Sequence, residues 1–227
     1  MKVKALSSLY RNCLPLLWQQ KIDVARGESQ VFRPCFQETK SIFIHIPKAA
    51  GTSISRAIYG MNVGHKKAID YCNISTKEFN KYYRFSFVRN PWDRVVSAYN
   101  FAKQGGTEYV QPIPNSIYQS EVFSNFETFV TQWLPNANLH MEDVVFAPQY
   151  WYIYDSNAKL LVDFVGKIEY LEKDLKIIEN RLKTNIELKR LNKSTRNIDY
   201  RNYYNEKTKA IVAKVYHKDI ELFNYDF

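Results

Sequence analysis

The residues in this sequence best suited to chemistry are a lysine, a glycine and two hydroxyl side chains in one short segment. Lys48 precedes Gly51, Thr52 and Ser53. An ammonium group, two hydroxyl groups and the backbone N–H groups of a tight turn are donors that bind phosphate or sulfate. The segment is therefore predicted to hold an anion, and Gly51 is expected to let that anion approach the backbone closely.

A second anion site is indicated by Arg89 and Ser97. A guanidinium gives a phosphate two parallel N–H donors, and a hydroxyl on a helix can give a third. Asn90 is a good helix cap and Pro91 suits the first helical position. Arg89 is therefore expected at the end of a strand, with Ser97 about two turns into the helix that follows.

The first site needs an element on each side of its loop. Residues 42–46 form a short apolar run rich in β-branched side chains and ended by Pro47, which predicts a buried strand. Apolar residues then recur at helical spacing at positions 54, 57 and 58, and Gly60 stands where a helix would stop. In the order strand, loop, helix, the loop N–H groups point outward together with a helix N-terminus, whose dipole favours an anion.

The rest of the chain alternates strands and helices. Residues 83–101 predict a strand and a helix that buries Trp92, Val95, Val96 and Tyr99. Further along we expect a polar loop over 102–122, a helix from a capping box at Ser124 to Pro135, strands over 150–155 and 160–170, a helix over 171–183, a short strand and basic loop over 187–197, and a helix over 205–223 with Ile211, Val212, Val215 and Leu222 inward.

This alternation predicts an α/β fold, a three-layer domain with a central, mainly parallel sheet. Ligands of such sheets bind outside the carboxyl ends of the strands, where both Lys48 and Arg89 are expected. Residues 41–227 are predicted to form the single domain. Residues 1–40 are expected to be a lead-in packed on it, with Leu14, Leu16, Leu17 and Trp18 in a short helix.

Composition sets broader limits. The 227 residues carry a net charge of +9, which suits an anionic cofactor, an anionic acceptor or nucleic acid without choosing among them. Cys13, Cys35 and Cys72 match no metal signature and are expected to be reduced thiols. The sequence shows neither a transmembrane span nor a signal peptide, which favours a cytoplasmic protein or a soluble part of a larger one.

The motifs that carry the two sites resemble those of sulfotransferases. FIHIPKAAGTS is similar to the 5′-phosphosulfate loop of enzymes that use 3′-phosphoadenosine 5′-phosphosulfate (PAPS), in the sulfotransferase family 2 and heparan-sulfate-type branch. That family usually reads PKTAGTS, and Ala49 replaces its Thr. FVRNPWDRVVSAY resembles the family's 3′-phosphate-binding segment.

The resemblance implies a P-loop-like strand–loop–helix site for PAPS and its desulfated product PAP. Lys48 and Ala50 to Ser53 would bind the 5′-phosphosulfate, with Lys48 stabilising the leaving phosphate. Arg89 and Ser97 would bind the 3′-phosphate.

The transfer also needs a general base for the acceptor hydroxyl. Relatives of the heparan-sulfate 6-O-sulfotransferase kind place their proposed base histidine between the two motifs, where this chain has His65. We expect His65 to contact the acceptor as the base, with Lys66 and Lys67 lowering its pKa. His140 and Glu169 are the alternatives.

Two later segments resemble the family more weakly. FAPQYWYI suggests Gln149 as an acceptor contact. RLNKSTRN resembles a segment that closes over the nucleotide, so Lys193, Ser194 and Arg196 are candidate cofactor contacts. A solvated basic loop explains those three residues equally well.

The sequence therefore predicts a PAPS-dependent sulfotransferase acting on a carbohydrate hydroxyl, with an anionic or polymeric glycan suggested by the charge and the 102–122 loop. The first rival is a nucleotide kinase. Its P-loop would place Lys after the second Gly, and it would need an Asp for Mg²⁺ where this chain has Arg89, so no metal is predicted. The second rival is a non-enzymatic binder of anionic polymers, which would leave both phosphate sites idle; nucleic acid is not the expected partner.

Overall fold

The computed structural model describes residues 14–27, 30–106, 116–188 and 199–227. Its described strands form one parallel sheet in the order β1–β2–β3. Their bounds are Ser41–Ile44, Tyr83–Val88 and Phe164–Lys167. Phe43 pairs in register with Phe85, which in turn pairs with Phe164. The predicted α/β class with a parallel sheet is confirmed.

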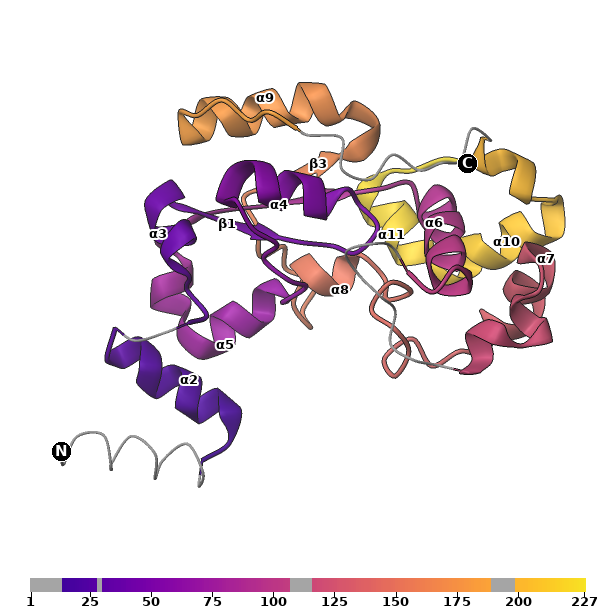
Figure 1. Ribbon diagram of the computed structural model, residues 1–227, viewed down its shortest axis with the longest axis horizontal. Helices are drawn as coiled ribbons and strands as arrows, with labels where there is room; N and C mark the ends of the chain where they lie inside the picture. The colour runs from indigo at the N-terminus through magenta and orange to yellow at the C-terminus, as the bar shows by residue number, and fades with distance from the viewer. Residues whose placement is uncertain (1–13, 28–29, 107–115, 189–198) are drawn as a thin grey trace.

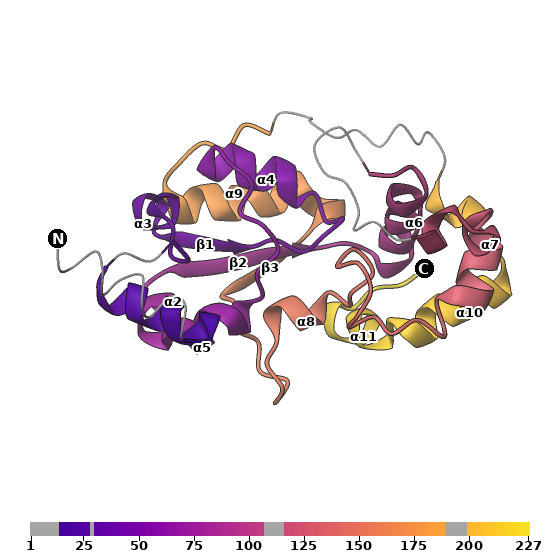
Figure 2. The same ribbon diagram turned by 60° about the horizontal axis from the view of Figure 1, so that its bottom comes forward.

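Helices cover both faces of this sheet (Figures 1 and 2). α4 (Gly51–Tyr59) and α9 (Leu171–Leu182) lie on one face, and α5 (Ala68–Phe79) and α8 (Tyr150–Ile153) lie on the other. The other α-helices are α2 (Leu16–Ala25), α3 (Pro34–Thr39), α6 (Pro91–Lys103), α7 (Phe126–Thr128), α10 (Glu206–Val215) and α11 (His217–Phe223). Short 3₁₀ segments span Ser116–Gln119, Glu121–Phe123, Ile168–Tyr170 and Tyr200–Tyr203, and a π-helical turn spans Phe129–Trp133.

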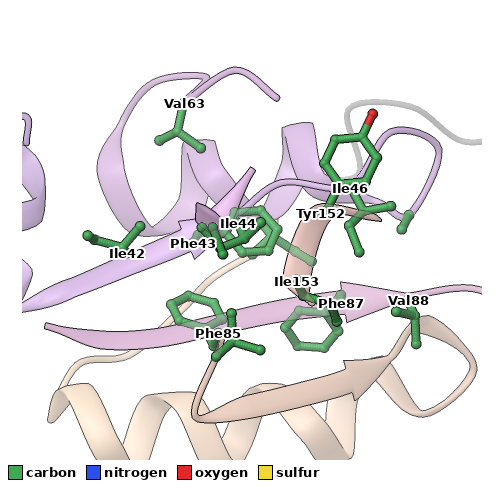
Figure 3. Packing of buried hydrophobic residues seen from close by; sticks show 14 of the residues in the cluster. Ile42, Phe43, Ile44, Ile46, Val63, Phe85, Phe87, Val88, Tyr152 and Ile153 are labelled. Atoms are coloured by element: carbon green, nitrogen blue, oxygen red, sulfur yellow. The ribbon is translucent and has the colours of Figure 1, made fainter. Parts of the chain in front are cut away.

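Two clusters of buried apolar side chains hold the fold together. The first is centred on the sheet, where the Phe43 ring stacks on Phe85 with centroids 5.2 Å apart (Figure 3). The second is centred on α6, where the Tyr99 and Phe129 rings lie 5.2 Å apart. Because α6 follows β2 directly, the carboxyl end of β2 leads from the first cluster into the second.

The two units that were expected to carry the sites form as predicted. α4 ends at Gly60, whose φ of 70° is left-handed and whose N–H donates to the Arg56 carbonyl at 2.9 Å. Asn90 caps α6, because its Oδ1 accepts the Trp92 N–H at 3.0 Å. The predicted apolar face of α6, which includes Val96 and Tyr99, is buried.

The strand expected over 150–155 is wrong. This stretch forms the short helix α8 and then a single bridge at Tyr154. The Asp219 carboxylate accepts the N–H groups of Gln149 and Tyr150 at 2.8 and 2.9 Å, so it caps the helix from about 70 residues away in sequence. Aromatic residues favour strands locally, but this distant cap favours a helix.

The later elements also differ in detail. The strand expected over 160–170 is limited to β3. The helix over 205–223 is broken at Tyr216, whose hydroxyl donates to the Phe146 carbonyl at 2.8 Å, and the break leaves Leu222 41% exposed instead of inward. The cap near 124 is Asn125, whose Oδ1 accepts the Thr128 N–H at 2.8 Å, and not Ser124.

The expected helix of the lead-in forms as α2, but the four apolar residues expected to pack on the domain do not. Leu16 and Trp18 are 67% and 57% exposed, and Leu14 and Leu17 are exposed as well. Within the described residues, no helix is both long and apolar enough to cross a membrane.

Candidate active site

The loop between β1 and α4 has an unusual backbone. Lys48 and Ala50 have φ of 66° and 57°, in the left-handed region that costs an L-residue about 1–2 kcal/mol. Left-handed residues in a tight loop turn successive N–H groups into a concave anion site, so strain at this position is consistent with ligand binding.

The packing around Gly51 gives a second reason for a glycine, besides the close approach of an anion expected from the sequence. Its φ is not left-handed, but a Cβ added there would lie 1.8 Å from Cδ2 of His45. The buried imidazole of His45, on the residue that follows β1, therefore fills the space a side chain would take.

The N-terminus of α4 offers further donors. The N–H groups of Ser53 and Ile54 donate to the Ala50 carbonyl at 3.1 and 3.2 Å. Gly51 and Thr52 come earlier in the helix, where backbone N–H groups have no intrahelical acceptor. Together with the helix dipole, these donors suit an anionic group beside Lys48.

One stripe of α6 brings the two predicted anion sites together. Asp93, Ser97 and Phe101 follow one another at intervals of four residues and so lie on one side of the helix. Oδ2 of Asp93 lies 2.8 Å from Nε and 2.7 Å from Nη2 of Arg89, and the Lys48 ammonium lies 4.2 Å from the centre of the Phe101 ring. Ser97 is thus one turn from the partner of each cation.

Arg89 also connects the two sites directly. Its Nη1 donates to the Lys48 carbonyl at 3.2 Å. The Gln149 side chain holds the backbone of Arg89 from behind, because Oε1 accepts the Arg89 N–H and Nε2 donates to the Arg89 carbonyl, both at 2.9 Å. Gln149 is fully buried, so it has no exposed atom for the acceptor contact that was expected of it.

The environment of Lys48 weakens its hold on a proton. Burial, and then the nearby charges of Arg89 and Arg94, lower the pKa of Lys48 to about 8, while Asp143 acts in the opposite direction. A bound anion would restore the stability of the ammonium form.

A backbone contact fixes the tautomer of the neutral His65 ring. Its Nδ1 lies 3.0 Å from the His45 carbonyl, which can only accept, so Nδ1 carries the proton and Nε2 has the free lone pair. Burial is the main reason that the pKa of His65 is lowered, with Arg94 and Lys48 adding to the effect. The direction matches the expectation, but the cause is not the Lys66–Lys67 pair.

Comparison with known proteins identifies a family for this chain. The sequence model of the sulfotransferase family matches residues 36–226. The chain belongs to the sulfotransferase family. This sulfotransferase is also similar to an uncharacterized protein of Archaeoglobus fulgidus, with 32% identity over 102 residues that make up 45% of the chain and 68% of that protein. No solved structure matches.

Two residues beside the candidate site were not predicted from the sequence. Arg94 is 1% exposed and donates to backbone carbonyl groups, and Asp143 is 5% exposed and accepts the Val145 N–H at 3.1 Å. Neither belongs to a spacing pattern. For Arg94, the sequence signal is a charged residue that interrupts the apolar face of a helix. Asp143 has no such signal.

The other residues predicted for the site are two alternative bases and three cofactor contacts. The exposed His140 ring stacks on Trp151 with centroids 3.9 Å apart. The Glu169 carboxylate accepts the Tyr225 hydroxyl at 2.8 Å and the Asn90 N–H at 2.6 Å, which places it on the Arg89 side. Lys193, Ser194 and Arg196 lie outside the described residues. The described part of the chain contains no group of three or more His, Cys, Asp or Glu side chains that could hold a metal.

Proposed function

We propose that this sulfotransferase transfers the sulfuryl group of PAPS to a hydroxyl group of a carbohydrate acceptor. The observation that carries the proposal is the α6 stripe, which gathers Lys48, Arg89 and Ser97 at the carboxyl end of the sheet. Family membership supports sulfuryl transfer in general. The carbohydrate class rests on the resemblance of the motifs to the heparan-sulfate-type branch.

The residues fit a ligand with two separate anionic groups. The left-handed loop, Lys48 and the start of α4 suit the 5′-phosphosulfate, as preorganised donors. Arg89 and Ser97 suit the 3′-phosphate, and contacts with Asp93 and the Lys48 carbonyl already orient the guanidinium. A nucleotide without a 3′-phosphate would leave the second group of donors unused.

The chemistry then divides between the two ends of the transferred group. PAPS supplies the sulfuryl group and a phosphate leaving group. Nε2 of His65 accepts the proton of the acceptor hydroxyl as its oxygen bonds to sulfur and the bond from sulfur to the 5′-phosphate oxygen breaks. The Lys48 ammonium and the N–H groups of Gly51 and Thr52 stabilise the negative charge left on that phosphate oxygen.

Replacing Arg89 with alanine is expected to reduce the selectivity of the protein for PAP over adenosine 5′-monophosphate. The loss should be about 2–3 kcal/mol of binding free energy, the scale of a hydrogen-bonded contact between charged groups. Isothermal titration calorimetry with both nucleotides measures it. Arg84→Ala is the control, because Arg84 pairs with Asp163 at the other end of β2. Equal affinity of the wild-type protein for the two nucleotides would rule out a 3′-phosphate site.

The pH profile of kcat/KM is expected to be bell-shaped, since this ratio reports the free enzyme. The base must be neutral, so activity should rise with pH through a pKa below the usual value for histidine. Anion binding needs the charged lysine, so activity should fall as pH exceeds the Lys48 pKa of about 8. Lys48→Arg should move the alkaline limb to higher pH, and an unmoved limb would assign it to another group.

The acceptor can be identified with radiolabelled PAPS and a panel of neutral glycans, anionic polysaccharides and small phenols, with EDTA present because no metal is expected to be needed. Label in a glycan supports the proposal. Label in phenols alone refutes the carbohydrate class. In a parallel assay without EDTA, transfer that requires both ATP as donor and Mg²⁺ would identify the protein as a kinase.

A further inference from the structure

Arg94 is the most deeply buried cationic side chain near the loop. It lies on α6 with 1% of its surface exposed. Its Nε donates to the Pro47 carbonyl at 3.0 Å, and its Nη2 donates to the carbonyls of Val145 and Ala147 at 3.1 and 2.6 Å. One side chain therefore joins α6, the loop before Lys48 and the 145–147 segment.

Burying a guanidinium costs several kcal/mol even when its N–H groups are hydrogen bonded, and apolar residues of similar volume often serve packing at least as well. Arg94 is therefore a poor choice if its only task is to fill the core. An apolar side chain has no hydrogen-bond donor, so it could not fix the direction of carbonyl groups as Arg94 does.

The carbonyl that Arg94 holds precedes the strained residue of the loop. The Pro47 ring fixes its own φ, and the bond from Arg94 fixes the direction of its carbonyl. Arg89 holds the next carbonyl, that of Lys48. Because a trans peptide is planar, the N–H groups of Lys48 and Ala49 must then point away from the arginines that hold these carbonyls.

We propose that Arg94 is a positioning residue of the phosphosulfate loop, which fixes the peptide before Lys48 and so sets where the loop donors and the lysine stand. The inference rests on the proposed function of this site. Arg94 and Arg89 belong to one short segment, so the segment that binds one end of the nucleotide also shapes the loop for the other end.

Arg94 also places a positive charge near both reacting groups, which gives the test a second readout. The charged groups that face Lys48 are Arg89 and Arg94 with Asp143 opposing them. His65 is influenced by Arg94, Lys48 and Asp143, and its ring lies 4.2 Å from that of His45. Loss of the Arg94 charge should therefore raise the pKa of Lys48, which a purely structural role would not do.

Two variants separate geometry from charge. Arg94→Lys keeps the charge but cannot span three carbonyls, and Arg94→Gln removes the charge. PAP affinity, measured by calorimetry, is expected to fall about tenfold or more in both. NMR titration of ¹³C-labelled lysine in the ligand-free protein, with Lys48→Arg to identify the signal, should show a raised Lys48 pKa in Arg94→Gln, which lacks the nearby positive charge.

The matched control is Arg84→Lys, which breaks an arginine pair with Asp163 far from the loop and should change neither readout. Wild-type PAP affinity in Arg94→Lys overturns the inference, whatever happens to the melting temperature. If Arg94→Gln does not fold, Arg94→Lys alone decides. Failure of the wild-type protein to bind PAP would refute the proposed function itself, and this result is distinct from binding that Arg94 does not influence.

Discussion

Replacing His65 with asparagine is expected to lower kcat by about 10²–10⁴-fold and to leave PAP affinity unchanged. The asparagine amide can still donate to the His45 carbonyl, which His65 Nδ1 approaches at 3.0 Å, but it has no basic nitrogen for the acceptor proton. The variant therefore removes the proposed base and keeps the contact that anchors residue 65. Single-turnover rates with labelled PAPS, together with calorimetric titration of PAP, measure the two quantities separately.

His140→Asn is the matched control for this experiment. His140 is exposed and stacked on Trp151, so its replacement should retain close to wild-type activity. Near-complete activity in His65→Asn would transfer the role of base to His140 or to Glu169. Loss of PAP binding by a folded His65→Asn protein would instead place His65 on the cofactor side of the site.

Replacing Lys48 with alanine is expected to reduce both rate and cofactor binding. The rate should fall about 10²–10³-fold, the scale for removing one preorganised donor at a developing anion. PAP affinity should fall roughly 10–100-fold, because the proposed site has the ammonium in contact with the phosphate of the product as well. Rapid-quench kinetics and calorimetry measure these effects. Lys173→Ala on α9 is the control for the loss of one exposed positive charge.

The same variant should not lose stability, and this distinguishes it from a simple folding defect. The pKa of Lys48 is lowered from 10.5 to about 8 in the folded protein. Below pH 8 Lys48 is protonated in both states, and its protonation is less favourable in the folded state, which lowers the free energy of unfolding. This cost is relieved as pH rises from about 8 toward 10.5. Lys48→Ala should therefore melt at or above the wild-type temperature at neutral pH. A large drop in melting temperature would contradict this account of Lys48.

The parts of the site that local sequence specifies were predictable. The strand, loop and helix around Lys48, and those around Arg89, were predicted because burial periodicity, a cap at Asn90 and a stop at Gly60 act within a few residues. The tautomer of His65 was not predictable, because it depends on the carbonyl of His45 across the fold.

Other features depend on contacts between distant segments. The conversion of an aromatic strand candidate into α8 follows from Asp219, and the role of Arg94 follows from carbonyls of two separate loops. Gln149 was predicted as a possible acceptor contact, but its side chain is bonded to the Arg89 backbone. Such contacts carry no periodicity, so a single sequence gives no signal for them.

The contact between Gly51 and His45 restricts the order in which this loop can change in evolution. A first mutation from Gly51 to any other residue places a Cβ inside the His45 imidazole. Such a mutation is therefore not tolerated while the His45 ring is present. A first mutation of His45 to a small residue removes the nearest obstacle to a Cβ at position 51. The two positions are therefore epistatic, and descendants of this sequence without the glycine should already have lost the histidine.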